Sequence, residues 1–365
     1  MAADAAATLD EAYLRLHRTG PEFDGWLSNH GPMAAEAMAR GGHAGDVHRW
    51  LDSYVRRLEE FPRGSGPIGA DWPEALGDPR RIADWTTFFC RETAAQPWGE
   101  VLDCWWPRLL PGVAASATHG IIRVGHAVRA LLADGDDAAH VTELAHGLAY
   151  WAARWQPVPS IGTHGQAAPT AARTRGQAPE LTPAAALAAV PRIARQSGGY
   201  RERLPRLAGL AGWPPAPPAA LVQGPAEEAS AWLAGLADAA VTAYLEYGHG
   251  NPVMLVHSAT APTAILRTLP ALDRELWVPS AAAGWDATAA ITAIYAAPTP
   301  APRETLPAAP AGPGAAEETF ARAVGHGDEH VIKFADTAAE VHARTGDPAA
   351  LAAAVYATEL IPREP

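Results

Sequence analysis

Histidine is the residue type whose number and placement in this chain point most directly to chemistry. The sequence has 14 histidines, and the neutral imidazole is both the commonest metal ligand and a side chain that exchanges a proton near neutral pH. An imidazole buried without a partner costs on the order of 1 to 3 kcal/mol, so a histidine in an apolar segment needs a hydrogen bond or a metal. Either partner satisfies a single histidine, and a hydrogen-bonded core histidine is the commoner case. Four such segments stand out, around His30, His119, His257 and His330.

Two of these segments carry a second polar group on the same helix face. His119 and His126 are seven residues apart, which is two helical turns. His330 and Lys333 are three residues apart and also share a face. His326 joins that face only if Gly327 does not interrupt the helix.

Lys333 is the only lysine among the 28 basic residues. Arginine cannot lose its proton, form a Schiff base or carry a carbamate, so a position that retains lysine in an arginine-rich chain is a candidate for such chemistry. The neighbours Val331, Ile332 and Phe334 favour burial, which lowers the pKa of an amine. A neutral lysine can take up carbon dioxide, and the carbamate that results is an anionic oxygen ligand. The alternative is a surface cation whose apolar stem alone is covered.

The elements that position these residues are expected to be helices. The chain is 48% hydrophobic, rich in alanine and poor in β-branched runs, which favours helix over strand. We predict an all-α protein in which residues 1–365 form one large domain. Pro-rich loops are expected near 211–225 and 297–314, and a lid or entrance loop at 156–181. Helical periodicity marks residues 9–19, 32–41, 45–60, 96–110, 119–132, 137–155, 183–195, 226–247, 256–270, 286–296, 316–345 and 348–358.

Several function classes are disfavoured by composition and motifs. The net charge is −12 and no arginine run interleaves with aromatics, so a nucleic-acid partner is not expected. No stretch reaches the ~18 to 20 apolar residues of a membrane span, and Met1 is not followed by a secretory signal. Cys90 and Cys104 do not form a disulfide scaffold, so a cytoplasmic location is expected. Residues 64–69 match a dinucleotide fingerprint, but they follow a helical segment and contain Pro67, which predicts a surface loop.

Together, the histidine segments resemble the questin oxidase-like family in order and spacing. The resemblance begins with the stretches around His17 and His30, and continues through residues 119–126 and 256–261. It ends with His-Val-Ile-Lys at 330–333 and Arg-Thr-Gly-Asp-Pro at 344–348. It implies oxidation of anthraquinone-like aromatic polyketides by dioxygen, including ring cleavage of the Baeyer–Villiger type.

For metal-bearing members the resemblance also implies a non-haem Fe(2+) centre. The ligands carried over to this chain are His30, His119, His257, His330 and a carboxylated Lys333. The chain departs from the family pattern His-x-x-x-His-x-Gly-Tyr, because it has Arg123 at the second histidine and His126 at the tyrosine. We predict both as catalytic groups, with His126 also the reserve ligand that replaces His119 or lies behind it.

Two other functions are consistent with the same sequence. One is a metal-free Baeyer–Villiger monooxygenase that uses NADPH, a reductant the iron enzyme could also require. The other is a non-catalytic helical protein that binds a polyketide. In the enzyme, the aromatic substrate is expected to stack on tryptophan, with Trp26 or the Trp105 and Trp106 pair as candidates. Core packing is the commoner role for any one of the 13 tryptophans. The sequence leaves the oligomeric state open.

Overall fold

The computed structural model describes residues 2–159 and 181–363, and their secondary structure is almost entirely helical. The predicted all-α class is therefore confirmed. Most of the predicted lid loop at 156–181 lies outside the described residues. The one sheet in the described part is a short hairpin of two strands with two residues each. In it, β1 (Glu22–Phe23) pairs antiparallel with β2 (Leu27–Ser28).

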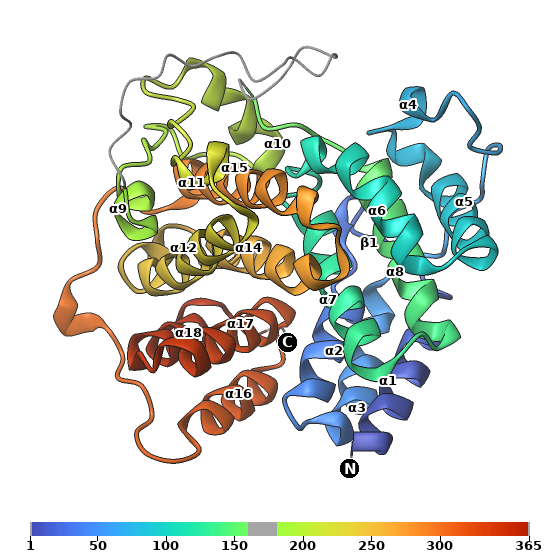
Figure 1. Ribbon diagram of the computed structural model, residues 1–365. Coiled ribbons are helices and arrows are strands. Elements are labelled where there is room, and N and C mark those ends of the chain that lie inside the picture. Colours follow the sequence, from blue (N-terminus) through green and yellow to red (C-terminus); the bar gives the residue numbers. More distant parts are fainter. Residues whose placement is uncertain (1, 160–180, 364–365) are drawn as a thin grey trace.

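The helices fall into two groups in Figure 1. Those of the N-terminal half are α1 (Ala2–Leu16), α2 (Gly31–Arg40), α3 (Ala44–Tyr54), α4 (Trp72–Ala75), α5 (Ile82–Ala95), α6 (Trp98–Leu109), α7 (His119–Asp134) and α8 (Ala138–Ala153). Those of the C-terminal half are α9 (Pro183–Ala188), α10 (Tyr200–Arg203), α11 (Ala220–Gln223), α12 (Ala226–Tyr247), α13 (Pro252–Leu255), α14 (His257–Thr268), α15 (Trp277–Tyr295), α16 (Ala315–His326), α17 (Glu329–Thr345) and α18 (Pro348–Leu360).

Four helices join the two groups and form the centre of the molecule. Helix α7 packs against α2 and α14, and α17 packs against the same two helices. Helices α7 and α14 approach each other closely, since a Cβ on Gly125 would lie 2.6 Å from the Cα of Ala264. Glycine is needed at this position because any side chain would push the two helices apart. Residues from both halves of the sequence thus meet in one shared core.

The structure differs from the predicted helices at two informative places. The periodic segment 316–345 is two helices, because Gly327 adopts a left-handed φ of +91° and ends α16. Helix α5 was not predicted, since its central Thr86, Thr87, Phe88 and Phe89 are weak helix formers. Burial of its aromatic face against Trp105 outweighs that propensity.

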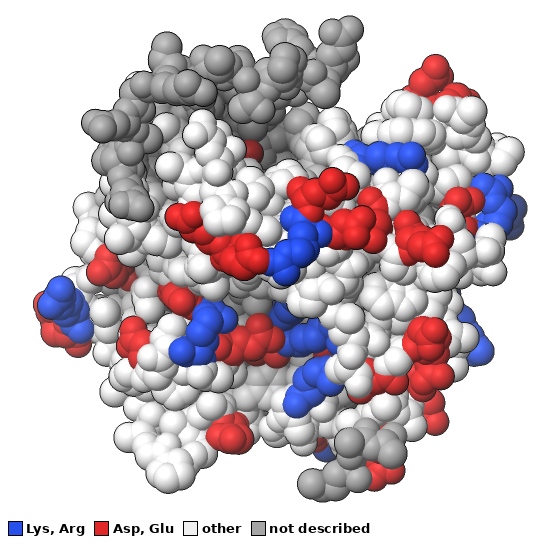
Figure 2. Space-filling view, in the orientation of Figure 1, with Lys and Arg blue, Asp and Glu red and all other residues white. Residues whose placement is uncertain are grey.

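The loop expected at residues 64–69 is present and binds the chain's own carboxylate. The backbone N–H groups of Ser65 and Gly66 donate to Asp84 at 2.8 and 3.1 Å. Figure 2 shows acidic and basic side chains interspersed over the visible face. Among the described helices, none combines the length and the apolar character that crossing a membrane would require.

Candidate metal centre

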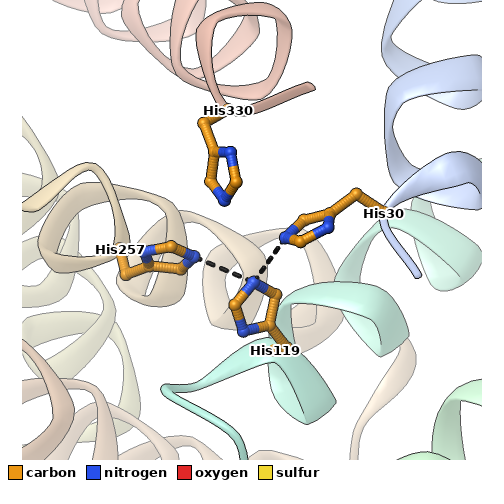
Figure 3. A group of neighbouring side chains, drawn as sticks. All are labelled: His30, His119, His257 and His330. Atoms are coloured by element: carbon orange, nitrogen blue, oxygen red, sulfur yellow. Dashed lines mark hydrogen bonds between the residues drawn. The ribbon is translucent and has the colours of Figure 1, made fainter. Parts of the chain in front are cut away.

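Four imidazoles, which we call the histidine tetrad, converge between α2, α7, α14 and α17 (Figure 3). One ring nitrogen from each lies within 4.8 Å of the others. The Nε2 atom of His119 is 2.7 Å from Nε2 of His30 and 3.0 Å from Nε2 of His257. The centre of the His330 ring lies 4.5 Å from that of the His30 ring, and the two ring planes are tilted by 60°. The four histidines among the five predicted metal ligands are thus brought to one point, although the first and the last are 300 positions apart in the sequence.

Each of these histidines stands at the N-terminal end of its helix. His30 is the N-cap of α2, and its backbone N–H donates to the Tyr54 hydroxyl at 2.5 Å. His119 and His257 are the first residues of α7 and α14. His330 lies in the first turn of α17, where its own N–H donates to the Asp328 carboxylate at 2.8 Å. Helix starts place the side chains at fixed points on rigid elements.

The turn before His119 is strained. Ser116, Ala117 and Thr118 all have left-handed φ values, at 47°, 56° and 72°. Such a conformation costs roughly 1 to 2 kcal/mol for each non-glycine residue, and strain of this kind clusters at functional sites. Its effect here is to aim the Ser116 carbonyl at the Nδ1 atom of His119.

Backbone carbonyls determine which nitrogen carries the proton in two of the rings. The Nδ1–H group of His119 donates to the Ser116 carbonyl, and that of His257 donates to the Met254 carbonyl at 3.0 Å. Their Nε2 atoms therefore carry lone pairs, and these two acceptors face each other at 3.0 Å. A hydrogen bond from His30 can satisfy one of them only. A cation between the rings is what would satisfy both.

The spacing suits a metal ion. Two nitrogen ligands at right angles, each roughly 2.1 Å from a metal, lie roughly 3.0 Å apart. The observed Nε2 separations of 2.7 and 3.0 Å are close to that value. Four imidazoles suit iron, zinc, copper or nickel rather than calcium or magnesium, which prefer oxygen.

Burial favours the neutral form of three of the tetrad rings. His30, His119 and His257 are 3%, 7% and 0% exposed, and burial is the main reason that the pKa of each lies well below the ordinary imidazole value. The positive charge of Lys333 lowers all three pKa values further. The side chain of His330 is 12% exposed, so it is the most accessible of the four. Neutral imidazoles need not lose a proton before they bind a metal.

Lys333 is fully buried, and its Nζ atom has no hydrogen-bond partner. Burial lowers the pKa of the amine to about 8, although the charges of Glu329 and Asp328 raise it. The surface-cation alternative is therefore excluded. The side chain instead lies close enough to influence three of the tetrad histidines.

Arg123 and His126 lie outside the tetrad. The Arg123 guanidinium forms two hydrogen bonds with the buried Glu143 carboxylate, at 2.5 and 2.9 Å. His126 is 2.7 Å from Glu36 through Nδ1 and accepts from Arg267 through Nε2 at 3.2 Å. The catalytic role of Arg123 and His126 therefore stays a prediction. His126 was also the reserve for His119 as a ligand, and it is His119 that lies in the tetrad.

The other sequence candidates also have their own partners. His326 is separated from α17 by Gly327 and its Nε2 is hydrogen-bonded to the Ile361 carbonyl at 3.0 Å. Trp26 lies in the turn of the hairpin between β1 and β2 and is 45% exposed. Trp105 and Trp106 are buried in aromatic clusters, so they are core packing.

Sequence reasoning missed the polar groups that surround the tetrad. Glu329 is 2% exposed, lies 3.5 Å from Nδ1 of His30 and pairs with Arg57 at 2.6 Å. The Ser116 and Met254 carbonyls hold the tautomers of the other two rings. The only feature of the sequence that could have pointed to Glu329 is its position directly before His330.

In comparisons with known proteins, no family model matches the chain, and no curated sequence matches it. The geometry of the tetrad therefore carries the functional argument.

Proposed function

We propose that this protein is a non-haem iron oxygenase that oxidises or cleaves a ring of an anthraquinone-like aromatic polyketide. The observation that carries the metal is the pair of facing lone pairs on His119 and His257, whose tautomers are set by backbone carbonyls. The choice of iron, oxygen and substrate comes from the resemblance of the histidine segments to the questin oxidase-like family. When bound, iron would supply the electrons that activate dioxygen.

The protein residues have separate roles in this proposal. His30, His119, His257 and His330 would hold the ion through ring nitrogens. The Glu329 carboxylate lies 3.5 Å from Nδ1 of His30, beyond a hydrogen bond. The Ser116 and Met254 carbonyls keep two of the rings in the binding tautomer. Such outer partners strengthen histidine ligands and commonly affect metal affinity 10- to 100-fold.

Lys333 would supply a fifth, anionic ligand as a carbamate. Carbon dioxide adds to the neutral amine, a C–N bond forms, and the displaced proton leaves to solvent. The supporting observations are a fully buried amine without a partner and a pKa of about 8, which leaves part of the population neutral near physiological pH. A carbamate would bring one negative charge to a centre that otherwise combines a divalent cation with neutral imidazoles.

The first experiment is a metal measurement on the purified protein, reconstituted anaerobically with Fe(2+) with and without bicarbonate. We expect one iron per chain and tighter binding with bicarbonate. Oxygen consumption is then measured with a hydroxyanthraquinone, in the presence and absence of NADPH.

Each alternative gives its own result in that experiment. Turnover with NADPH in metal-free protein would overturn the iron proposal in favour of a metal-free Baeyer–Villiger monooxygenase. Binding of the anthraquinone without oxygen consumption under any condition would indicate a polyketide-binding protein. Failure of wild-type protein to bind Fe(2+), Co(2+) or Zn(2+) would reject the metal centre altogether.

A further inference from the structure

The four helices that carry the tetrad meet a second time, in a group of charged side chains. Each of these residues lies six to ten positions after the tetrad histidine of its own helix, which is roughly 9 to 15 Å along the axis. We call this group the charged network, and it consists of Glu36 on α2, His126 and Arg129 on α7, Arg267 on α14, and Asp336 and Glu340 on α17.

Arg129 connects three of the four helices. Its Nε donates to Glu36 on α2 at 2.8 Å. Its Nη groups donate to Asp336 and Glu340 on α17 at 2.9 and 2.5 Å. The Glu36 side chain is fully buried. Burial alone would raise the pKa of this carboxyl, but Arg129 and His126 hold it well below its ordinary value.

Arg267 brings in the fourth helix. It donates to Asp336 at 2.6 Å, to Glu340 at 2.9 Å and to Nε2 of His126 at 3.2 Å. His126 donates in turn to Glu36 at 2.7 Å, so α2, α7, α14 and α17 are joined in a closed set of contacts. Glu36, His126 and Asp336 each offer a ligand atom within 4.8 Å of the others. The guanidiniums of Arg129 and Arg267 already pair with these carboxylates and would repel a cation, so we assign no second metal site here.

From this we propose that the charged network positions the four helices so that the tetrad is preformed before a metal binds. The inference rests on the proposed metal function. Facing acceptors such as those of His119 and His257 repel each other without a cation, so something else must hold them at 3.0 Å. The network is the polar connection that all four ligand-bearing helices share in the described part of the chain.

Burying charged side chains costs desolvation free energy, so the network is better explained by fixing the positions of the helices than by stabilising the fold. Replacing a buried ion cluster with well-packed apolar residues is often neutral or stabilising. An apolar layer, however, permits neighbouring helices to slide or rotate with little penalty. Bidentate guanidinium pairs have strict geometry, so they fix the register of α7 and α14 against α2 and α17.

The test compares two isosteric variants that each neutralise a buried carboxylate. Glu36→Gln affects the charged network. Asp84→Asn is the matched control, because Asp84 is 5% exposed, accepts several hydrogen bonds and lies on α5, which carries no tetrad histidine. Three quantities are measured for both variants and wild type: the Tm of metal-free protein, the rise in Tm on adding Co(2+), and the Co(2+) affinity with its d–d spectrum.

We expect both variants to lower the Tm of metal-free protein. Glu36→Gln alone should weaken Co(2+) binding about 10- to 100-fold, the usual range for an outer-shell group, shrink the metal-induced rise in Tm and alter the d–d spectrum. Arg267→Lys, which keeps the charge but loses the planar fork, should act in the same direction and serves if Glu36→Gln does not fold.

Wild-type Co(2+) affinity and spectrum in both Glu36→Gln and Arg267→Lys would overturn the positioning role while leaving the metal centre intact. Equal weakening in Asp84→Asn would overturn it too, because the effect would then follow from lost stability. Absence of Co(2+) binding in wild-type protein would instead reject the proposed function itself.

Discussion

The histidine tetrad and the charged network occupy the same four helices, yet they differ in how their polar groups are satisfied. In the network the carboxylates and guanidiniums contact one another at hydrogen-bonding distance, and His126 uses both of its ring nitrogens. In the tetrad, two acceptors face each other, and neither Nδ1 of His30 nor Nζ of Lys333 has a hydrogen-bond partner.

This difference indicates that the charged network has a structural role and that the histidine tetrad is the candidate binding site. A buried polar group without a partner costs free energy, so a chain that concentrates several of them at one point gains a binding site at the expense of stability. The satisfied network can stabilise the helix arrangement by itself. The facing acceptors of the tetrad lack such partners, which is why we propose the metal there.

Removal of His119 should have the largest effect on metal binding of all the substitutions considered. His119 contacts both His30 and His257 through Nε2, so His119→Ala deletes the central ligand. We expect iron and cobalt binding to become undetectable in a titration that saturates wild type. His140→Ala is the control, since His140 is equally buried but lies on α8, and it should retain metal.

Replacement of Lys333 tests whether the unpartnered amine has a chemical role. In Lys333→Arg a permanent cation would lie beside the metal, and an uncompensated buried charge costs about 3 to 5 kcal/mol. We expect loss of both metal and oxygen consumption with an unchanged circular dichroism spectrum. Lys333→Ala should lose them too, with partial rescue by acetate. Wild-type metal content and turnover in Lys333→Arg would show that no carbamate is needed.

The titration of His126 should make the stability of the folded protein depend on pH. Burial, followed by the charge of Arg267, lowers the pKa of His126 from 6.5 to about 4. Between pH 6.5 and 4, His126 is protonated in the unfolded chain but neutral in the folded protein. The free energy of unfolding therefore falls as the pH drops from 6.5 to 4. The full effect is roughly 3 kcal/mol.

The measurement is urea unfolding of metal-free protein across that pH range. His126→Gln should show a shallower loss of stability on acidification than wild type, because glutamine does not titrate. Parallel curves for the two proteins would mean that His126 contributes nothing to the acid sensitivity of the network.

An exposed ion pair provides the smallest expected effect and sharpens the contrast with the buried network. Arg322 and Glu318 on α16 form an i,i+4 pair whose side chains are 51% and 53% exposed. Such pairs contribute about 0.3 to 0.5 kcal/mol. Glu318→Gln should therefore shift the free energy of unfolding by less than about 0.5 kcal/mol and leave Co(2+) binding unchanged. A shift as large as that of Glu36→Gln would imply that charge loss alone, not burial in the network, governs the response.

Local sequence signals were sufficient where helix-forming residues continue along one periodic segment. Helix α12 spans the predicted residues 226–247, and the predicted helix at 119–132 corresponds to α7 at His119–Asp134. Helix α5 was missed because its aromatic residues disfavour helix locally and are buried only after α6 and α8 pack on it. A prediction from propensity has no access to that burial.

The sequence by itself determined the all-helical class, because residue type and helical spacing are local properties. The four histidines and Lys333 were singled out as ligands by the resemblance of their segments to the questin oxidase-like family. Only the tertiary structure decided that the Ser116 and Met254 carbonyls set the tautomers. It also decided that charges such as Glu36 and Arg129, which on isolated helices predict solvated faces, meet in the interior. The physical reason is that hydrogen-bond direction and burial depend on the packing of helices far apart in the chain, and no single helix contains that information.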